Sequence, residues 1–303
     1  MDRLEAMQVF VRVAQAGSFS AVSQQLNVDR SWVTRQIAAL EKHLGVKLFT
    51  RSTRRLSLTP AGSIYLEKSR VILNLVDAAE SDAVEERAVP RGPIRLGIPL
   101  AYGLQVLTPW LLEFSKTYPA IELSVDLSDE RVNLIEQGLD LSVRITGHLQ
   151  PGDVVRKLAD CPMVTFASLG YLSLHGTPRR PQDLESHECL VYSNAPTRTQ
   201  WVFQQQQQKI SVSVRGRIMA NNGLLLTEAA AQGVGIARQP YFIAKSYIDA
   251  GLVKPILEKY EISPLGVYAV LPSNRYIPHR ISVLMKFLAD RMAPANKAAK
   301  QRT

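Results

Sequence analysis

The sequence predicts an α/β protein that begins with an all-α-type segment. Over residues 1–45, apolar side chains recur every three or four positions, which is the period of amphipathic helices. After segment 89–93, which contains two prolines and a glycine, short alternating apolar runs take turns with helical patterns. This order is typical of a parallel sheet with right-handed helical crossovers.

The composition excludes several classes of protein. The chain has 303 residues, 36 Lys+Arg against 27 Asp+Glu and a formal net charge of +9, and 46% of it is hydrophobic. A chain of this length and hydrophobic content folds without disulfide or metal and is not intrinsically disordered. Its two cysteines, Cys161 and Cys189, have no CxxC spacing, so two reduced, packed thiols are favoured over a single bridge.

The N-terminal sequence indicates a cytoplasmic, reducing location. Asp2, Arg3 and Glu5 precede any apolar run, so no secretory signal is recognised. No stretch of about 18 apolar residues is present to span a bilayer, and we expect no membrane partner. The positive net charge permits a nucleic acid partner without requiring one.

Charge is distributed unevenly along the chain. Residues 30–70 carry nine basic and two acidic residues, a net charge of +7, whereas residues 71–90 carry one basic and five acidic residues, a net charge of −4. This reversal suggests a surface that faces a polyanion, followed by a segment with another role. A solvated charged surface is the alternative.

Two short helices are predicted first. Apolar positions 4, 7, 11 and 14 mark one helix, which Gly17 ends. Ser18 is a suitable N-cap for a second helix over residues 19–26, and Asn27 tolerates the left-handed conformation of a tight turn.

The third helix is the predicted recognition element. Asp29 is its expected N-cap, and Gly45 ends it after Leu44. Three helices with a tight turn between the second and the third describe a helix-turn-helix, whose third helix lies in the major groove. Arginine binds guanine and glutamine binds adenine through paired hydrogen bonds. The predicted DNA contacts of this region are Ser18, Arg30, Ser31, Trp32, Thr34, Arg35 and Gln36. Trp32 either contacts a thymine methyl group or covers the second helix.

A wing and a long helix follow. Apolar runs at 46–49 and 56–58 flank a basic turn, which predicts a β-hairpin. Its expected contacts with phosphates or the minor groove are Arg51, Thr53, Arg54 and Arg55. Thr59 and Pro60 then begin a helix to about residue 88, with apolar residues at positions 64, 71, 75 and 78. This helix either mediates dimerisation, which its acidic surface favours, or packs on its own domain.

These residues resemble the LysR-type transcriptional regulators. The resemblance covers the whole chain, is strongest over residues 1–66, and is carried by segments 7–10, 16–21, 37–41, 44–49 and 54–62. One departure is segment 28–32, Val-Asp-Arg-Ser-Trp, which stands where the family usually opens its recognition helix with Ser-Pro or Ser-Gln and small residues. The operator sequence is therefore not inferred from relatives.

The resemblance implies three parts. Residues 1–59 form a winged helix-turn-helix DNA-binding domain, residues 60–89 a linker and dimerisation helix, and residues 90–303 an effector-binding regulatory domain. The last is similar to periplasmic solute-binding proteins, with α/β subdomain I at about 90–163 and 266–303 and subdomain II at about 164–265. The chain would cross between the subdomains near Met163 and return near Leu265.

The expected elements of the last part follow from its apolar patterns. Predicted strands are 94–98, 121–127, 141–145, 163–167, 189–192, 210–214, 234–237 and 266–271. Predicted helices are 104–118, 132–137, 224–232 and 278–292. The glutamine run 204–208 is expected to be an exposed loop between strands.

A small-molecule pocket is predicted at the carboxyl ends of the strands. The expected effector-binding residues are Pro99, Leu100, Ala101, Tyr102, Thr146, Asn222 and Gly223. In the family, as the resemblance implies, hydroxyls and helix N-terminal amides hold carboxylate effectors. Segment 99–103 offers only the Tyr102 hydroxyl, so the effector is anionic, more apolar or absent. Arg144 either compensates or faces outward.

Enzyme motifs are not recognised. The segment Gly233-Val234-Gly235 is not a dinucleotide fingerprint, no Gly-x-Ser-x-Gly occurs, and the five histidines lack metal spacing. We therefore expect no catalytic residue, metal or cofactor. The predicted function is a sequence-specific regulator that binds double-stranded operator DNA and senses a small molecule as a homodimer or homotetramer. A stand-alone solute-binding protein is the alternative, and the helix-turn-helix counts against it.

Overall fold

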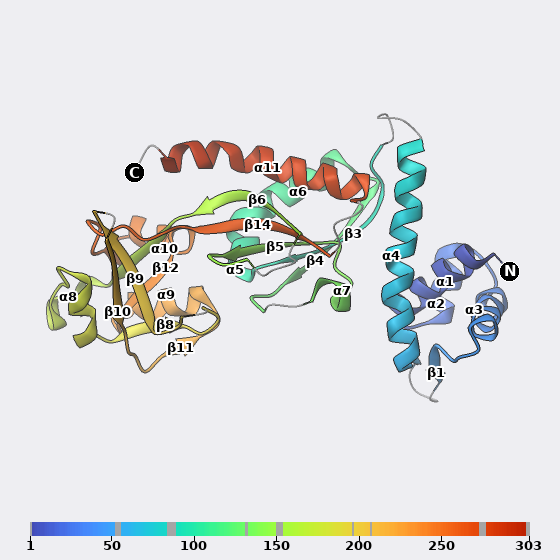
Figure 1. Cartoon of the computed structure of the whole chain (residues 1–303), viewed down its shortest axis with the longest axis horizontal. Helices are drawn as coiled ribbons and strands as arrows, with labels where there is room; N and C mark the ends of the chain where they lie inside the picture. The colour runs from blue at the N-terminus through green and yellow to red at the C-terminus, as the bar shows by residue number, and fades with distance from the viewer. Residues whose placement is uncertain are drawn as a thin grey trace. The chain divides into compact units, whose positions relative to one another are not determined.

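The computed structural model describes residues 2–51, 56–83, 89–130, 133–149, 154–195, 197–206, 208–272 and 277–300 (Figure 1). The chain divides into two compact units. One holds residues 1–89 with the short segments 135–138 and 274–279, and the other holds the remainder. The predicted fold class is confirmed: a helix-turn-helix region precedes two mixed α/β sheets.

The first three helices begin and end close to the predicted positions. They are α1 (Arg3–Ala16), α2 (Phe19–Leu26) and α3 (Arg30–Leu44). Asn27 adopts the predicted left-handed conformation, with φ 53°. Asp29 occupies the N-cap position of α3, but its side chain makes no capping hydrogen bond, so the sequence predicted its place correctly and its contact wrongly.

The core of this region fixes the orientation of α3. Val33, Ile37 and Leu40 are 0–2% exposed and pack with apolar residues of α1 and α2. These three residues lie on one face of the helix, since they are spaced by four and three positions. Burial of that face leaves the opposite, polar face of α3 to solvent.

The hairpin and the next helix join the same core. β1 (Phe49–Arg51) pairs antiparallel with β2 (Leu56–Leu58), and α4 (Pro60–Ala83) follows. The Thr59 hydroxyl accepts the Gly62 N–H at 2.8 Å and caps α4. A Cβ at Gly62 would lie 2.0 Å from the Leu48 carbonyl oxygen, so only glycine fits there. Residues 84–88, the expected end of this helix, lie outside the described residues.

A buried carboxylate joins the end of α3 to the hairpin. Glu41 is 8% exposed, and its carboxylate accepts the Lys47 ammonium at 2.6 Å and the N–H groups of Leu48 at 2.9 Å and Phe49 at 3.3 Å. Burial alone would raise the pKa of Glu41, but these hydrogen bonds outweigh it and hold the pKa below its ordinary value of 4.5.

The first sheet of the larger unit has the strand order β4-β3-β5-β14-β6. Its strands are β3 (Gly92–Ile98), β4 (Ile121–Leu127), β5 (Leu141–Thr146), β6 (Val154–Cys161) and β14 (Leu265–Leu271). β3 is parallel to β4 and β5, whereas β14 is antiparallel to both β5 and β6. The predicted parallel arrangement is confirmed for β3, β4 and β5. Only β14 runs in the opposite direction, because it belongs to the chain segment that returns from the second sheet, and β6 pairs antiparallel with it.

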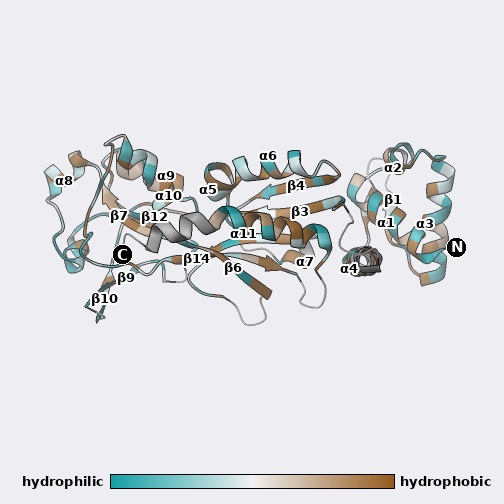
Figure 2. Ribbon diagram, turned by 90° about the horizontal axis from the view of Figure 1, so that it is seen from above, coloured by the Kyte–Doolittle hydropathy of each residue, from teal (hydrophilic) through white to brown (hydrophobic). Residues whose placement is uncertain are grey.

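Helices cover this sheet. α6 (Thr108–Thr117) and α11 (His279–Lys300) pack side by side, with the rings of Phe114 and Phe287 5.3 Å apart and an ion pair between Glu113 and Arg291. β14 is buried along most of its length, and Figure 2 shows that α6 carries both colours. This is the pattern of an amphipathic helix that covers a sheet. The short helix α7 (Leu134–Gln137) precedes β5.

The predicted helix over residues 104–118 begins earlier than expected. Helical backbone starts at Leu100 with α5 (Leu100–Tyr102), continues through a π turn (Gly103–Leu107) and runs into α6. The segment after Pro99 is therefore the first turn of a helix and not a loop. Pro99 supplies the extended residue before that turn, with ψ 133°.

The second sheet has the strand order β11-β8-β12-β7-β13. Its strands are β7 (Met163–Ala167), β8 (Cys189–Tyr192), β11 (Met219–Ala220), β12 (Ile236–Pro240) and β13 (Lys254–Pro255). Its helices are α8 (Leu169–His175), the 3-10 turn Pro181–Ser186, α9 (Gly223–Ala231) and α10 (Tyr241–Asp249). The chain enters this sheet through Pro162 and leaves it before Leu265, close to the predicted crossings.

A separate hairpin holds most of the glutamine run. β9 (Gln200–Gln205) pairs antiparallel with β10 (Gln208–Ser213), so Gln204, Gln205 and Gln208 lie in strands and not in the predicted loop. Trp201 and Phe203 alternate with exposed residues and are buried, which anchors the hairpin. Gln207 lies outside the described residues.

Both cysteines are free and buried, as predicted. Burial raises the pKa of each thiol, Cys161 and Cys189, to about 12, so neither is a thiolate at neutral pH. Within the described part of the chain, no helix is long and apolar enough to cross a membrane.

Replacement of Glu41 by alanine is expected to destabilise the N-terminal unit by about 1–3 kcal/mol, because the buried Leu48 and Phe49 N–H groups lose their acceptor. Lys47→Ala, at the exposed end of the same ion pair, is expected to cost less than about 1 kcal/mol. Hydrogen exchange of the α3 core amides in the full chain measures both changes. Equal effects of the two variants would contradict the role given to the amide contacts.

The same contact has a predictable pH dependence. Since the folded-state pKa of Glu41 lies below 4.5, its contribution is complete above the unfolded pKa and is lost as pH falls through the folded value. The Glu41→Ala variant should lack this acid-dependent part of the stability.

Candidate functional site

Three of the predicted DNA contacts lie on the exposed face of α3. Arg30, Ser31 and Arg35 are exposed. Thr34 is half-buried, and its hydroxyl donates to the Arg30 carbonyl oxygen at 3.0 Å. These residues stand opposite the buried Val33 and Ile37, so the core of the helix-turn-helix presents them to a partner.

Other predicted contacts are engaged within the protein. Trp32 is half-buried and packs against the N-terminal core, which favours its structural alternative over a base contact. The Gln36 amide donates to the Glu5 carboxylate of α1 at 3.3 Å. The Ser18 hydroxyl accepts the Ala21 N–H at 3.3 Å and caps α2. Sequence spacing placed these side chains on helices but did not reveal their neighbours.

The wing residues are placed only in part. Arg51 is the last residue of β1, while its side chain and the predicted contacts Thr53, Arg54 and Arg55 lie outside the described residues.

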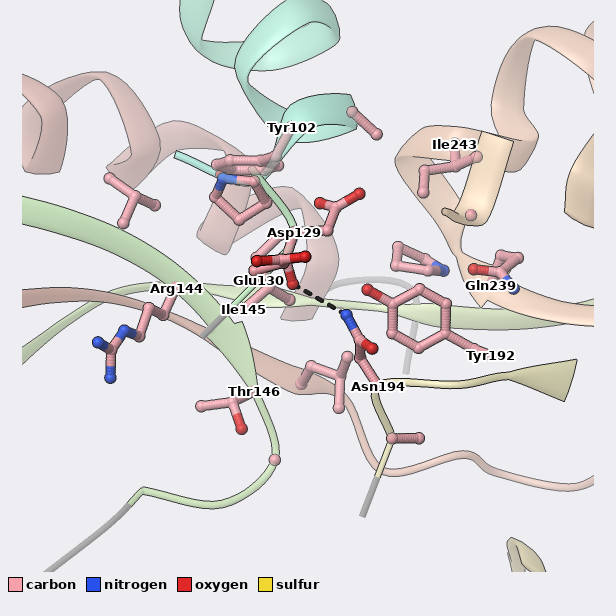
Figure 3. A pocket seen from close by; sticks show the side chains of 18 of the residues that line it. Tyr102, Asp129, Glu130, Arg144, Ile145, Thr146, Tyr192, Asn194, Gln239 and Ile243 are labelled. Carbon is pink, nitrogen blue, oxygen red and sulfur yellow. Dashed lines mark hydrogen bonds between the residues drawn. The ribbon is translucent and has the colours of Figure 1, made fainter. Parts of the chain in front are cut away.

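A cavity of about 330 Å³ lies between the two sheets of the larger unit (Figure 3). Five predicted effector residues line it: Pro99, Ala101, Tyr102, Thr146 and Gly223. Leu100 and Asn222 are not part of the lining. The Leu100 N–H, at the start of a helix, donates to Asp129. The Asn222 side chain caps another helix and also donates to Asp129.

The predicted hydroxyls of the pocket are already engaged. Tyr102 is 6% exposed, its ring packs edge-on against Phe242 at 5.1 Å, and its hydroxyl points to the Met292 sulfur at 4.0 Å. Burial raises the pKa of Tyr102 above its ordinary value. The Thr146 hydroxyl donates to the His148 carbonyl oxygen at 2.8 Å and accepts the His148 N–H at 3.1 Å. Neither hydroxyl is a ready donor for a bound anion.

Asp129, a polar residue of the lining, accepts three hydrogen bonds. Its Oδ1 accepts the Leu100 N–H at 3.1 Å and its Oδ2 accepts the Asn222 amide at 3.2 Å. The Asn194 amide donates to the Asp129 carbonyl oxygen at 3.0 Å, the bond dashed in Figure 3. Burial raises the pKa of Asp129 above 3.8, and the bonds from Leu100 and Asn222 oppose that rise.

The start of α9 forms another wall. Asn222 Oδ1 accepts the Leu224 and Leu225 N–H groups at 3.0 and 3.2 Å and caps the helix. A Cβ at Gly223 would lie 2.7 Å from Gln239 Oε1 and 2.8 Å from Ile243 Cδ1. Glycine is therefore the residue that keeps this wall of the pocket open.

β12 contributes two polar residues that the sequence did not single out. The Arg238 guanidinium lies 4.8 Å from the centre of the Trp201 ring and donates to the Val202 carbonyl oxygen at 3.2 Å. Burial lowers the pKa of Arg238 to about 10, so it remains a cation at neutral pH. Gln239 is 3% exposed, and its amide nitrogen has no hydrogen-bond partner among the described residues. Such a donor at a cavity wall needs water or a ligand.

Arg144 is half-buried and belongs to the lining. Figure 3 shows its side chain on β5, directed away from Asp129. No cluster of three or more potential metal ligands occurs within the residues that the structure describes.

Comparisons with known proteins agree with these features. The family "LysR substrate binding domain" matches residues 87–293, and "Bacterial regulatory helix-turn-helix protein, lysR family" matches residues 4–63. An uncharacterised HTH-type transcriptional regulator of Haemophilus influenzae is 30% identical over 283 residues, 93% of this chain and 98% of the relative. The HTH-type transcriptional regulator DmlR of Escherichia coli is 31% identical over 292 residues, 96% of this chain and 94% of the relative.

A solved structure is similar over nearly the whole length. CrgA, a LysR-type transcriptional regulator from Neisseria meningitidis, is 30% identical, with a TM-score of 0.60. The similarity covers 95% of this chain and 98% of CrgA.

Tyr102→Phe is expected to change the free energy of unfolding by less than about 1 kcal/mol, because the hydroxyl contacts only a sulfur atom. Tyr102→Ala should cost about 3–5 kcal/mol through loss of the buried ring. Chemical denaturation of the full chain compares them. A phenylalanine variant as unstable as the alanine variant would show that the hydroxyl matters more than the ring.

Proposed function

We propose a mode of action from the premise that this chain belongs to the LysR family of DNA-binding transcriptional regulators. A regulator of this family binds DNA through its helix-turn-helix and a small-molecule effector through its regulatory domain, and it is not an enzyme. The observation that carries the proposal is the exposed, basic face of α3, which burial of Val33, Ile37 and Leu40 orients away from the core.

We assign the three parts of the chain accordingly. Residues 1–59 act as the winged helix-turn-helix, 60–89 as linker and dimerisation helix, and 90–303 as the regulatory domain with subdomain I at about 90–163 and 266–303 and subdomain II at about 164–265. The chain works in the cytoplasm, because its partner is genomic DNA. Occupation of the pocket biases the arrangement of DNA-binding pairs on the operator.

Arg30, Ser31 and Arg35 are the proposed base or phosphate contacts of α3. Their exposure and their place in its first two turns support this role, since the early residues of a recognition helix face base edges. Arg51, Thr53, Arg54 and Arg55 are proposed to contact phosphates or the minor groove. The remaining predicted contacts are proposed to hold the exposed face of α3 in place through the interactions described above. They are also proposed to reach the DNA backbone at the edge of that face. These residues are Ser18, Trp32, Thr34 and Gln36.

A homo-oligomer is proposed on the basis of α4. This helix exposes four large apolar side chains: Ile64, Val71, Ile72 and Leu75. Such a run on one helix is typical of a contact with another protein surface. A second copy of the same helix supplies matching apolar residues, as a dimer or within a tetramer.

The pocket supports a small-molecule effector as the second partner. Its volume of about 330 Å³ is at the lower end of the usual range for ligand sites, and polar groups from both sheets converge on it. The same pocket is what a stand-alone solute-binding protein would need. The helix-turn-helix and its exposed arginines favour the regulator.

Arg35→Ala is expected to weaken binding to an operator fragment by about 1–3 kcal/mol if Arg35 contacts a base. The operator is first obtained by selection of genomic fragments on the purified protein. Arg12→Ala removes the same charge from an exposed position of α1 and is the matched control. Titration of both variants at one salt concentration measures the difference. Equal affinities of Arg35→Ala and the parent would show that Arg35 does not contact the operator.

A double substitution on α4, Val71→Asp with Leu75→Asp, is expected to dissociate the oligomer by at least one step, because it places charges in an apolar contact. Sedimentation of the full chain at micromolar concentration measures the mass. Lys68→Asp, at an exposed polar position of the same helix, is the control. An unchanged mass for the double variant would move the oligomer contact elsewhere.

A further inference from the structure

Asp129 stands at the junction of the two sheets. It follows β4 of the first sheet, and its carboxylate accepts the N–H of Leu100 on the same side. The amides of Asn222 and Asn194 reach it from the second sheet, one to the carboxylate and one to the carbonyl oxygen. One residue thus holds three hydrogen bonds that together span the pocket.

The Leu100 N–H is the group that an anionic ligand would use. It is the first N–H of a helical stretch that continues to Thr117, where unpaired N–H groups and the helix dipole favour negative charge. In this chain the Asp129 carboxylate already accepts from it. A ligand carboxylate at the same place would meet both an occupied donor and a like charge.

The side chains next to this helix start are already engaged, and the arginines of the lining, Arg144, Arg198 and Arg238, come from other parts of the chain. Pro99 has no N–H, and the Tyr102 and Thr146 hydroxyls bond to Met292 and His148. Asp126 and Glu130 add two more carboxylates to the lining, and Figure 3 shows Glu130 beside Asp129. The negative charge at this end is therefore supplied by the protein.

The opposite wall supplies an independent sign of a ligand. The Gln239 amide nitrogen is buried at the pocket without a partner among the described residues, so it needs an acceptor. A ligand that donates to Asp129 at one end and accepts from Gln239 elsewhere would satisfy both groups.

We propose, on the basis of the proposed regulatory function, that Asp129 is a built-in anion that fills the anion position of the effector pocket. The effector meets Asp129 with an ammonium group, and ligands that carry a carboxylate at this end are excluded. Asp129 is in this sense the residue that determines the charge class of the effector. An ammonium group that binds the Asp129 carboxylate competes with the Leu100 N–H and the Asn222 amide. The hydrogen bonds of these two groups to the carboxylate join the two sheets.

The test is calorimetric titration of the full chain with two probes of one shape and opposite charge, hexylamine and hexanoate. The parent is expected to bind hexylamine at least about tenfold more tightly than hexanoate, as one charged hydrogen bond implies. Asp129→Ala should reverse this preference, because it removes the charge and frees the Leu100 N–H. Glu122→Ala removes an equal charge from an exposed position of β4 outside the lining and should keep the preference of the parent.

Each result decides the proposal. A parent without preference for hexylamine overturns the assigned ligand class. The assignment of Asp129 as the built-in anion is overturned if Asp129→Ala gains no affinity for hexanoate, or if Glu122→Ala gains as much.

A second variant covers the case in which Asp129→Ala does not fold. Asp129→Asn keeps an acceptor for the Leu100 N–H but carries no charge, so it should lose about tenfold in hexylamine affinity and remain closed to hexanoate. Unchanged hexylamine affinity would refute the proposal. Binding of the parent to its selected DNA fragments tests the proposed function separately, because the calorimetry contains no DNA.

Discussion

Backbone N–H groups at the start of helices and strands need acceptors, and in this protein the side chains that supply them also position the functional surfaces. Ser18 accepts an N–H at the start of α2, just before the turn that leads to the recognition helix. Glu41 accepts two N–H groups at the start of the wing. Asn222 and Asp129 accept those at two helix starts around the pocket. Each of these contacts fixes where a helix or strand begins, and therefore which of its faces a partner meets.

The dependence on local contacts explains which parts of the fold the sequence predicts. Helices α1, α2 and α3 follow from periodicity and from residues such as Gly17 and Asn27, whose conformations are decided by neighbours within one turn. The direction of β14 depends on pairing with β5, more than a hundred residues earlier in the chain. No local sequence pattern predicts a pairing between strands so far apart in the chain. The strand β6 was missed for the same reason, since its partner β14 lies more than a hundred residues later in the chain.

The candidate site shows the same limit at the level of single residues. The rule that ligands bind at the carboxyl ends of strands selected Pro99, Thr146 and Gly223, which line the pocket. The same rule applied to β4 points to Asp129, which the sequence analysis passed over. Gln36 had the correct type and spacing for a base contact, yet its amide bonds to Glu5. Position on a helix is readable from sequence, whereas competition for a polar group is decided by the folded neighbours.

The energy available at Asp129 is of the size that regulation requires. A hydrogen bond to a charged group contributes about 1.5–3 kcal/mol, and coupling between two sites in an allosteric protein is typically about 1–3 kcal/mol. The bonds from Leu100 and Asn222 to one carboxylate come from opposite sides of the pocket. A ligand that competed for that carboxylate would exchange hydrogen bonds between the sheets for hydrogen bonds to the ligand, and this exchange is comparable in free energy to a typical allosteric coupling.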